Sequence, residues 1–174
     1  MTEIRTPRLL LRRWNPDDDL APLAEIQADP TVMHHIGDGA PRSLDDTAED
    51  IERWEEEWDD EGFGLFAVEL LGSGELAGAV GLYVPDAPPQ VADHIGIQWR
   101  LARQFWGQGY ASEAAQATLE FALQDRGIDR VVAVASELDA SSAKVLHKLG
   151  MALLPGKAEG GLRVYAIDLT EYEG

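Results

Sequence analysis

The chain has 174 residues, of which 45% are apolar, and its 32 acidic against 14 basic side chains give it a formal net charge of −18 at pH 7. This length suits one domain with a core of its own, and the composition is globular. So acidic a chain argues against binding to nucleic acids or anionic membranes, because both need a basic face. The charge either attracts a cationic partner such as an amine or marks a heavily solvated surface, and the scarcity of lysine favours the second reading.

Several kinds of site and location are disfavoured by what the sequence lacks. The absence of cysteine excludes disulfides, thiolate metal ligands and a cysteine nucleophile. The four histidines are scattered, so no metal site is expected. No apolar run has the length of a membrane span, and the first residues lack the apolar segment of a signal peptide. We therefore expect a cytoplasmic protein without a membrane partner.

The first half of the chain shows clear helix-capping residues and then a change to strand patterns. Asn15 and Ser43 each precede a stretch of helical character and act as N-cap candidates. Pro22 fits the first helix only if it lies in the first turn. Trp54 and Trp58 recur at helical spacing among acidic residues and are expected to point inward. The expected elements are a strand at residues 8–14, helices to about residue 28 and from 43 to about 58, and strands at 63–71, 75–84 and 91–101.

The second half predicts a helix, a buried strand, a short helix and two final strands. Gly127 closes the long helix as a residue suited to a left-handed C-terminal cap. The order of elements predicts a mixed α/β domain of the α+β type, with a mostly antiparallel central sheet, about four helices and one domain over residues 1–174. The expected elements are helices at residues 109–124 and 143–149 and strands at 130–135, 151–154 and 162–169.

The loop at residues 103–113 joins an apolar strand to the long helix. Gly107 and Gly109 remove two Cβ atoms, so an anion can approach the backbone closely, and they permit positive φ. The helix that follows presents free N–H groups and the positive end of its dipole to the loop. This arrangement is suited to phosphate oxygens, and a tightly packed β–α turn without a ligand is the alternative.

Two stretches in fixed order carry a resemblance to a known family. Residues 104–109 read Gln-Phe-Trp-Gly-Gln-Gly, and about thirty residues later Asp139-Ala140-Ser141-Ser142 opens a helix. Together they resemble the GNAT superfamily of acyl-CoA-dependent N-acetyltransferases, whose loop signature is (Arg/Gln)-x-x-Gly-x-(Gly/Ala). The run Trp-Gly-Gln-Gly-Tyr-Ala-Ser-Glu-Ala at 106–114 and the opening Thr-Pro-Arg-Leu-Leu-Leu-Arg at 6–12 are similar to the branch of the ribosomal-protein acetyltransferases RimJ and RimL. The resemblance covers essentially the whole chain and implies a GNAT-like sheet that is splayed at the cofactor site.

The resemblance implies a set of contacts for acetyl-CoA, the acyl donor. Backbone groups of Trp99, Arg100 and Leu101 pair with the amides of the pantetheine arm, and backbone amides of the loop hold the pyrophosphate. One departure from the family pattern is Asp139, which stands where asparagine is usual. Its carboxylate can cap the helix but repels an anionic cofactor. The implied loop contacts are Gln104, Gly107, Gln108, Gly109, Tyr110, Ala111 and Ser112, the last through its hydroxyl.

Two side chains are candidates for the chemistry itself. His94 lies where relatives commonly carry a glutamate, and an ordinary histidine titrates near neutrality, so it is a candidate general base. Its alternatives are an exposed histidine without a role and a base made of a chain of waters. Ser142 is the implied proton donor to the departing thiolate, unless it only caps its helix, and a backbone N–H near Trp99 is the natural donor to the oxyanion. His34 and His35 are weaker candidates to line the acceptor site.

The expected function is acetyl transfer from acetyl-CoA to a primary amine by direct attack on the thioester. The acceptor is either a protein N-terminal amine, as the branch suggests, or a small amine, and the protein is a monomer or a homodimer. The alternative is a catalytically silent acyl-CoA-binding sensor, because His94 stands where relatives commonly carry a glutamate and Asp139 where they usually carry an asparagine. A nucleotide-dependent oxidoreductase does not fit, since Ser112 occupies the third glycine position and an antiparallel meander precedes the loop.

Overall fold

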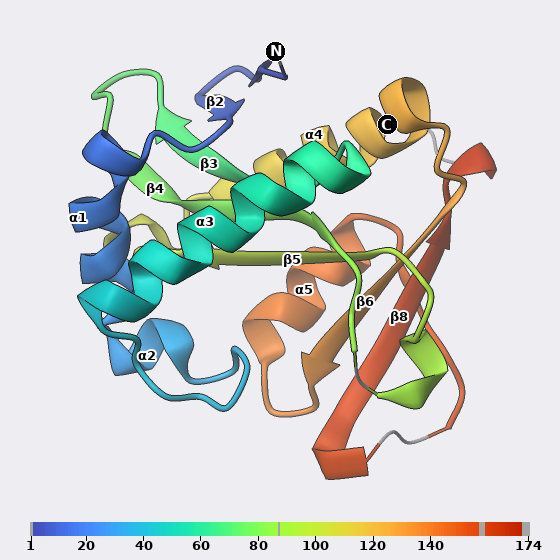
Figure 1. Cartoon of the computed structure of the whole chain (residues 1–174). Helices are drawn as coiled ribbons and strands as arrows, with labels where there is room; N and C mark the ends of the chain where they lie inside the picture. Colours follow the sequence, from blue (N-terminus) through green and yellow to red (C-terminus); the bar gives the residue numbers. More distant parts are fainter. Residues whose placement is uncertain (1, 87, 157–158, 172–174) are drawn as a thin grey trace.

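The computed structural model describes residues 2–86, 88–156 and 159–171, and Figure 1 shows the arrangement of its elements. Its strands form one sheet in the order β1-β2-β3-β4-β5-β6-β8-β7. The strands are β1 (Ile4–Arg5), β2 (Leu9–Arg12), β3 (Leu65–Leu70), β4 (Leu76–Tyr83), β5 (Gly96–Leu101), β6 (Arg130–Ser136), β7 (Ala152–Leu153) and β8 (Leu162–Asp168). The α-helices are α1 (Pro16–Gln27), α2 (Pro30–Met33), α3 (Leu44–Glu61), α4 (Tyr110–Arg126) and α5 (Ala140–Lys148). The mixed, mostly antiparallel architecture expected from the sequence is confirmed.

Helices cover both faces of the sheet. Apolar residues of β2 to β6 pack against α4 and α5 on one side, which we call the α4 face. Apolar residues of β3 and β4 pack on the other side against α1 and α3, which we call the α1 face. Figure 1 shows α3 crossing in front of the strands and α5 behind them. Trp54 and Trp58 are each 3% exposed, so both tryptophans of α3 point inward as predicted.

Capping chemistry places the helix ends close to the predicted positions. The Asn15 side chain accepts from the N–H groups at the start of α1. Ser43 and Asp46 form a reciprocal capping box at α3, and Gly127 ends α4 in the left-handed conformation at φ 63°. The prediction for Pro22 is wrong, because this residue lies well inside α1. It is only partly buried there, and the buried stripe of Leu23 and Ile26 holds the helix in spite of the lost N–H.

Other element boundaries differ from the predictions for local reasons. The expected strand at residues 91–101 begins only at Gly96, because a 3₁₀ turn (Pro89–Val91) and Asp93 at φ 68° precede it. The short strand β1 and the one-turn helix α2 carry too few residues for a periodic pattern and were not predicted. Helix α5 starts at Ala140 rather than residue 143, since Asp139 is its N-cap.

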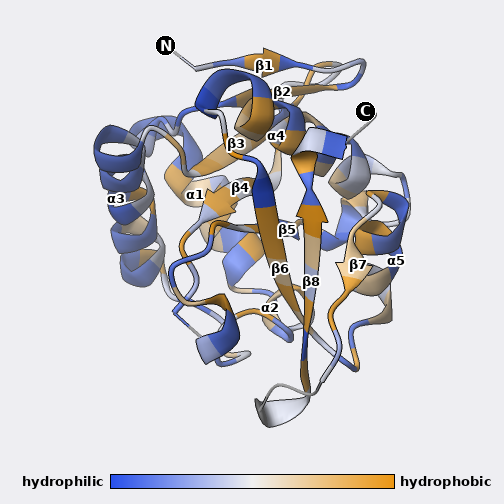
Figure 2. Cartoon of the chain, turned by 90° about the vertical axis from the view of Figure 1, so that its right-hand side faces the viewer, coloured by the Kyte–Doolittle hydropathy of each residue, from blue (hydrophilic) through white to orange (hydrophobic). Residues whose placement is uncertain are grey.

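The acidic surface lies largely on helices that face solvent. In Figure 2 the outer side of α3 is hydrophilic, while apolar residues mark β6 and β8. Within the described ranges, no helix is both long and apolar enough to cross a bilayer. The same residues contain no group of three or more metal-ligating side chains.

Candidate active site

The loop between β5 and α4 takes the shape that its glycines allow. Gly107 and Gly109 have φ angles of 75° and 82°, in the left-handed region that favours glycine. A Cβ on Gly107 would meet nothing within 4 Å, so the space above the backbone is open. Gly109 is the N-cap of α4 and offers no side-chain cap. Among the described residues, the N–H groups of 107–112 donate to no intramolecular acceptor, which leaves a row of donors for an anion.

Arg8, which immediately precedes β2, reaches across to this loop. Its Nη1 donates to the Gln108 carbonyl at 2.8 Å, and its Nε donates to Glu113 at 2.7 Å. The guanidinium lies over the Tyr110 ring, 4.3 Å from the ring centre. The remaining nitrogen, Nη2, is 3.4 Å from the position that a Cβ on Gly109 would take. Arg8 therefore fixes the loop and places a cation beside it, a role that the sequence pattern did not reveal.

Glu113 completes this connection from the first turn of α4. It accepts from the Thr6 hydroxyl at 2.6 Å and from the Arg8 N–H at 3.0 Å. Burial alone would raise the pKa of the Glu113 carboxyl, but the hydrogen bonds from Thr6 and Arg8 outweigh it and the pKa is lowered. The group is therefore ionised at neutral pH, where it holds Arg8 in position.

Trp106 ties the same loop to the end of β5. Its indole N–H donates to the Leu101 carbonyl at 2.9 Å, while 44% of the residue is exposed. Gln108 adds a bond from its side-chain amide to the Gln104 carbonyl at 3.2 Å. These bonds occupy loop carbonyls and side chains and leave the N–H row free.

β5 and β6 are parallel neighbours that separate after one paired position. Gly96 is in register with Val132, and the Val132 N–H donates to the Ile95 carbonyl at 2.9 Å. No later β5 residue pairs with β6 within the described chain. Figure 1 shows the two strands diverging from this point. The result is a gap in the sheet that opens toward the glycine loop.

The alternation of the backbone decides which groups of β5 face this gap. The Ala102 N–H donates to the Ala77 carbonyl of β4 at 2.8 Å. Because successive residues of a strand turn their N–H and C=O groups to opposite sides, those of Trp99 and Leu101 point into the gap and those of Arg100 point to β4. Trp99 thus offers its N–H and C=O to a ligand and Leu101 its N–H, since the Leu101 carbonyl already accepts from Trp106. The backbone of Arg100, expected to do the same, is used by the sheet.

The two catalytic candidates lie at different ends of the gap. His94 precedes β5 at the closed end, partly buried, with its Nδ1 3.2 Å from the Ala92 carbonyl. The extended chain from His94 to Trp99 spans on the order of 15 Å, which is farther than a histidine side chain reaches. Ser142 lies in the first turn of α5, where its N–H donates to the Asp139 carboxylate at 3.1 Å. Its hydroxyl has no hydrogen-bond partner in the described residues.

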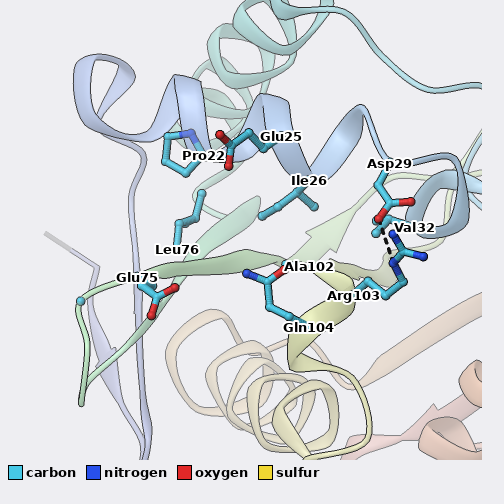
Figure 3. Close-up of a pocket in the computed structure, with 11 residues that line it drawn as sticks. Pro22, Glu25, Ile26, Asp29, Val32, Glu75, Leu76, Ala102, Arg103 and Gln104 are labelled. Carbon is cyan, nitrogen blue, oxygen red and sulfur yellow. Dashed lines mark ion pairs between the residues drawn. The ribbon is translucent and has the colours of Figure 1, made fainter.

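Two depressions flank the loop. One, of about 510 Å³, lies between α4, the end of α5 and β8, and its polar lining consists of Ser112, Gln116, Lys148, Asp168 and Glu171. The other, of about 340 Å³, lies between α1, the β3–β4 turn and the start of the loop. Figure 3 shows its carboxylates at Glu25, Asp29 and Glu75, with Asp29 paired to Arg103 at 3.1 Å. With three carboxylates against one arginine, the second depression is the less favourable of the two for phosphate.

Comparisons with known proteins agree with this geometry. A sequence profile described as acetyltransferase (GNAT) domain matches residues 8–152. The uncharacterized N-acetyltransferase YnaD of Bacillus subtilis (strain 168) is 30% identical over 149 residues, covering 85% of this chain and 81% of that protein. The crystal structure of an acetyltransferase from Agrobacterium tumefaciens str. C58 has a TM-score of 0.79 and 26% identity, covering 95% of this chain and 94% of that one.

The same fold is found in a structure that was solved with coenzyme A. RimL, a ribosomal L7/L12 α-N-protein acetyltransferase solved in complex with coenzyme A, has a TM-score of 0.77 at 17% identity, covering 96% of this chain and 98% of that one. At this identity the likeness concerns the fold alone. The profile match covers most of the chain, and it agrees with the splayed strands and the glycine loop at the start of α4. The chain belongs to the GNAT acetyltransferase family and is an acetyltransferase enzyme.

Proposed function

We propose that the protein transfers an acetyl group from acetyl-CoA to a primary amine by direct attack of the amine on the thioester. The observation that carries this proposal is the row of unpaired N–H groups at residues 107–112, directly after a strand that leaves its neighbour. Such a row at the positive end of a helix dipole attracts the oxygens of a pyrophosphate. The gap between β5 and β6 extends from this row of N–H groups. Its backbone groups at Trp99 and Leu101 can pair with the amides of the pantetheine arm.

The residues present fit each part of the donor. The loop N–H groups and Arg8 suit the pyrophosphate, and Trp99 and Leu101 suit the pantetheine amides. We assign the nucleotide end to the 510 Å³ depression beyond Ser112, where Lys148 is the cation available to a phosphate and Asp168 and Glu171 lie in the same lining. Asp139 fits less well, since its carboxylate lies at the start of α5 on the donor's side of the sheet.

The chemistry then requires few groups. The amine nitrogen forms a bond to the thioester carbonyl carbon, the C–S bond breaks, and the amine's proton goes in the end to the thiolate. The Trp99 N–H is the proposed donor to the carbonyl oxygen as it gains charge. The Ser142 hydroxyl is the proposed source of the thiolate's proton, and His94 acts as base only at the far end of a water chain.

The acceptor approaches from the side that the donor leaves open. The donor's phosphate site is at the N-terminus of α4, so the donor occupies the α4 face, and the amine must come from the α1 face. A protein N-terminal amine, as the name of RimL states for that protein, and a small amine both satisfy the reaction.

Calorimetric titration with acetyl-CoA, followed by mass spectrometry of an amine panel, tests the proposal. We expect micromolar donor binding and an acetylated product 42 mass units heavier, which is the mass of the acetyl group less one hydrogen. Absence of donor binding contradicts the proposal. Tight donor binding with no product from peptides or small amines identifies a sensor instead.

A further inference from the structure

Arg100 carries a buried cation without a carboxylate partner. The residue is 8% exposed, and its Nη1 donates to the Gln27 side-chain oxygen at 2.9 Å. Its Nη2 has only the Gln98 side-chain oxygen, at 3.2 Å, and its Nε has no partner among the described residues. Because a buried charge and an unpaired buried donor are both costly, such a group needs a physical explanation.

The surroundings of Arg100 contain more positive than negative charge. Asp50 is 1% exposed and already accepts from Arg42, Arg53 and Gln27. One carboxylate thus faces three guanidinium groups, and it is saturated before Arg100 is reached. Burial lowers the pKa of Arg100 to about 10, Asp50 opposes this, and Arg42 and Arg53 add to it. This local excess of positive charge stands out in so acidic a chain.

The free edge of Arg100 has the geometry that binds a carboxylate. Arg42 holds Asp50 through its Nε at 2.6 Å and its Nη2 at 2.8 Å, a two-pronged contact with both carboxylate oxygens. Arg100 presents the same Nε–Nη2 edge, occupied only by one neutral amide oxygen from Gln98. A carboxylate satisfies both nitrogens at once and supplies the missing negative charge. Arg42 and Asp50 therefore form, within the same chain, the two-pronged contact that Arg100 lacks.

Arg100 lies on the side from which an acceptor approaches. Gln98 and Arg100 alternate with Trp99 along β5, and Arg100 contacts α1 through Gln27 and lies over the Trp54 ring of α3, 5.3 Å from its centre. This is the α1 face, opposite the phosphate loop. Gln98, which accepts from Nη2, is only partly buried, so another acceptor can displace its side-chain oxygen from Arg100.

We propose that the acceptor is an amine that carries a carboxylate close to its amino group, as a free α-amino acid does, and that Arg100 binds this carboxylate on its Nε–Nη2 edge. The inference rests on the proposed acetyl transfer and names the acceptor class for the same site. A protein N-terminus has an amide where the amino acid has its carboxylate, so the site discriminates against it. Arg100 is then a specificity residue, and Gln98 takes the carboxylate's place when the site is empty.

The test compares acceptors that differ only in this group. Kinetics of the wild-type protein are measured with a panel of α-amino acids and with the corresponding amino-acid amides. We expect kcat/KM to be about 10- to 100-fold higher for the acids, the range of a hydrogen-bonded charged contact. The α-amines of the amides are less basic, so a larger fraction of them is neutral near pH 7. Amine reactivity alone therefore favours the amides over the acids. Equal or better use of the amides, or acetylation of peptide N-termini only, overturns the proposal.

Variants separate the site from general effects on the fold. Gln98→Glu places a carboxylate on the Arg100 edge, and we expect it to remove the preference for acids while raising thermal stability. Gln124→Glu makes the same chemical change on the exposed side of α4 and is the matched control. Arg100→Lys keeps the charge without the two-pronged edge and is expected to lose the preference as well. An acid preference that survives in Gln98→Glu contradicts the assignment, whereas absent acetyl-CoA binding by the wild type marks failure of the proposed function instead.

Discussion

The Nη1 atom of Arg8 donates to the Gln108 carbonyl across 2.8 Å and thereby joins the beginning of the chain to the centre of the glycine loop. Glu113 holds the same guanidinium from the other side at 2.7 Å. The loop that we assign to the donor's pyrophosphate is thus shaped by a residue about one hundred positions earlier. The net charge of −18 repels an anionic donor from the protein as a whole. Arg8 places a guanidinium group beside the loop that the donor must reach.

Arg8→Gln is expected to weaken acetyl-CoA binding about tenfold, since a charge-assisted contact and a local cation are lost. Acetyl-pantetheine lacks the pyrophosphate, so its binding should not change. Titration of both donors by calorimetry provides the comparison. Arg5→Gln removes the same charge from exposed β1 and serves as control. An equal loss for both donors would show that Arg8 acts on the fold and not on the phosphate site.

Gly107→Val is expected to abolish acetyl-CoA binding while leaving the fold largely intact. The new side chain enters the open space above the loop and blocks the N–H row. Gly127→Val is a matched variant, because Gly127 also has positive φ and open space, at the other end of α4. Both changes cost on the order of 1–2 kcal/mol of backbone strain, so their melting temperatures should fall alike. Retained donor affinity in Gly107→Val would contradict the phosphate assignment.

Asp139→Asn restores the residue that the family pattern has at this position. Asparagine caps a helix as well as aspartate, so α5 should stay capped through the Ser142 N–H. Removing one negative charge near an anionic donor should tighten acetyl-CoA binding a few-fold at low ionic strength, and less in 0.5 M salt where charges are screened. Dissociation constants at the two salt concentrations measure this. A gain that is independent of salt would point to a cause other than charge.

His94→Gln tests whether this histidine contacts the reacting amine. A general base in direct contact contributes about 10²- to 10⁴-fold to the rate. Because His94 lies at the closed end of the gap and is proposed to act only through a chain of waters, we expect kcat to fall by less than about tenfold. Steady-state kinetics over a range of pH provide the measurement. A loss of a hundredfold or more would show direct contact and require a different donor position.

The sequence predicted the fold through features that act locally. Helix N-caps form at Asn15, Ser43 and Asp139, and helices end at glycines in the left-handed conformation. Both features depend only on neighbouring residues, so the helix ends could be recognised in the sequence. The interior Pro22 was placed wrongly because its tolerance depends on how the buried face of α1 packs. The late start of β5 at Gly96 depends on the turn at Asp93, whose positive φ has no sequence signal.

The candidate site was predictable only in part. The glycine loop and the start of α5 follow continuous motifs: the loop glycines have the positive φ that they permit, and Asp139 caps α5, although the helix begins three residues earlier than predicted. Arg8 was not predicted, and Arg100 was predicted only through its backbone, because the side-chain partners Gln108 and Gln27 lie far away in the sequence. The backbone direction at Arg100 depends on the register between β4 and β5, which a single sequence does not encode in a readable form.

The most direct test of the central assignment is the response of the backbone amides in an NMR titration with acetyl-CoA. We expect the N–H signals of residues 107–112 to move strongly downfield, as amides do when they donate to phosphate oxygens, and to respond much less to acetyl-pantetheine. The signals of Trp99 and Leu101 should respond to both donors. Acetyl-CoA binding that leaves the amides of residues 107–112 unmoved would contradict the account.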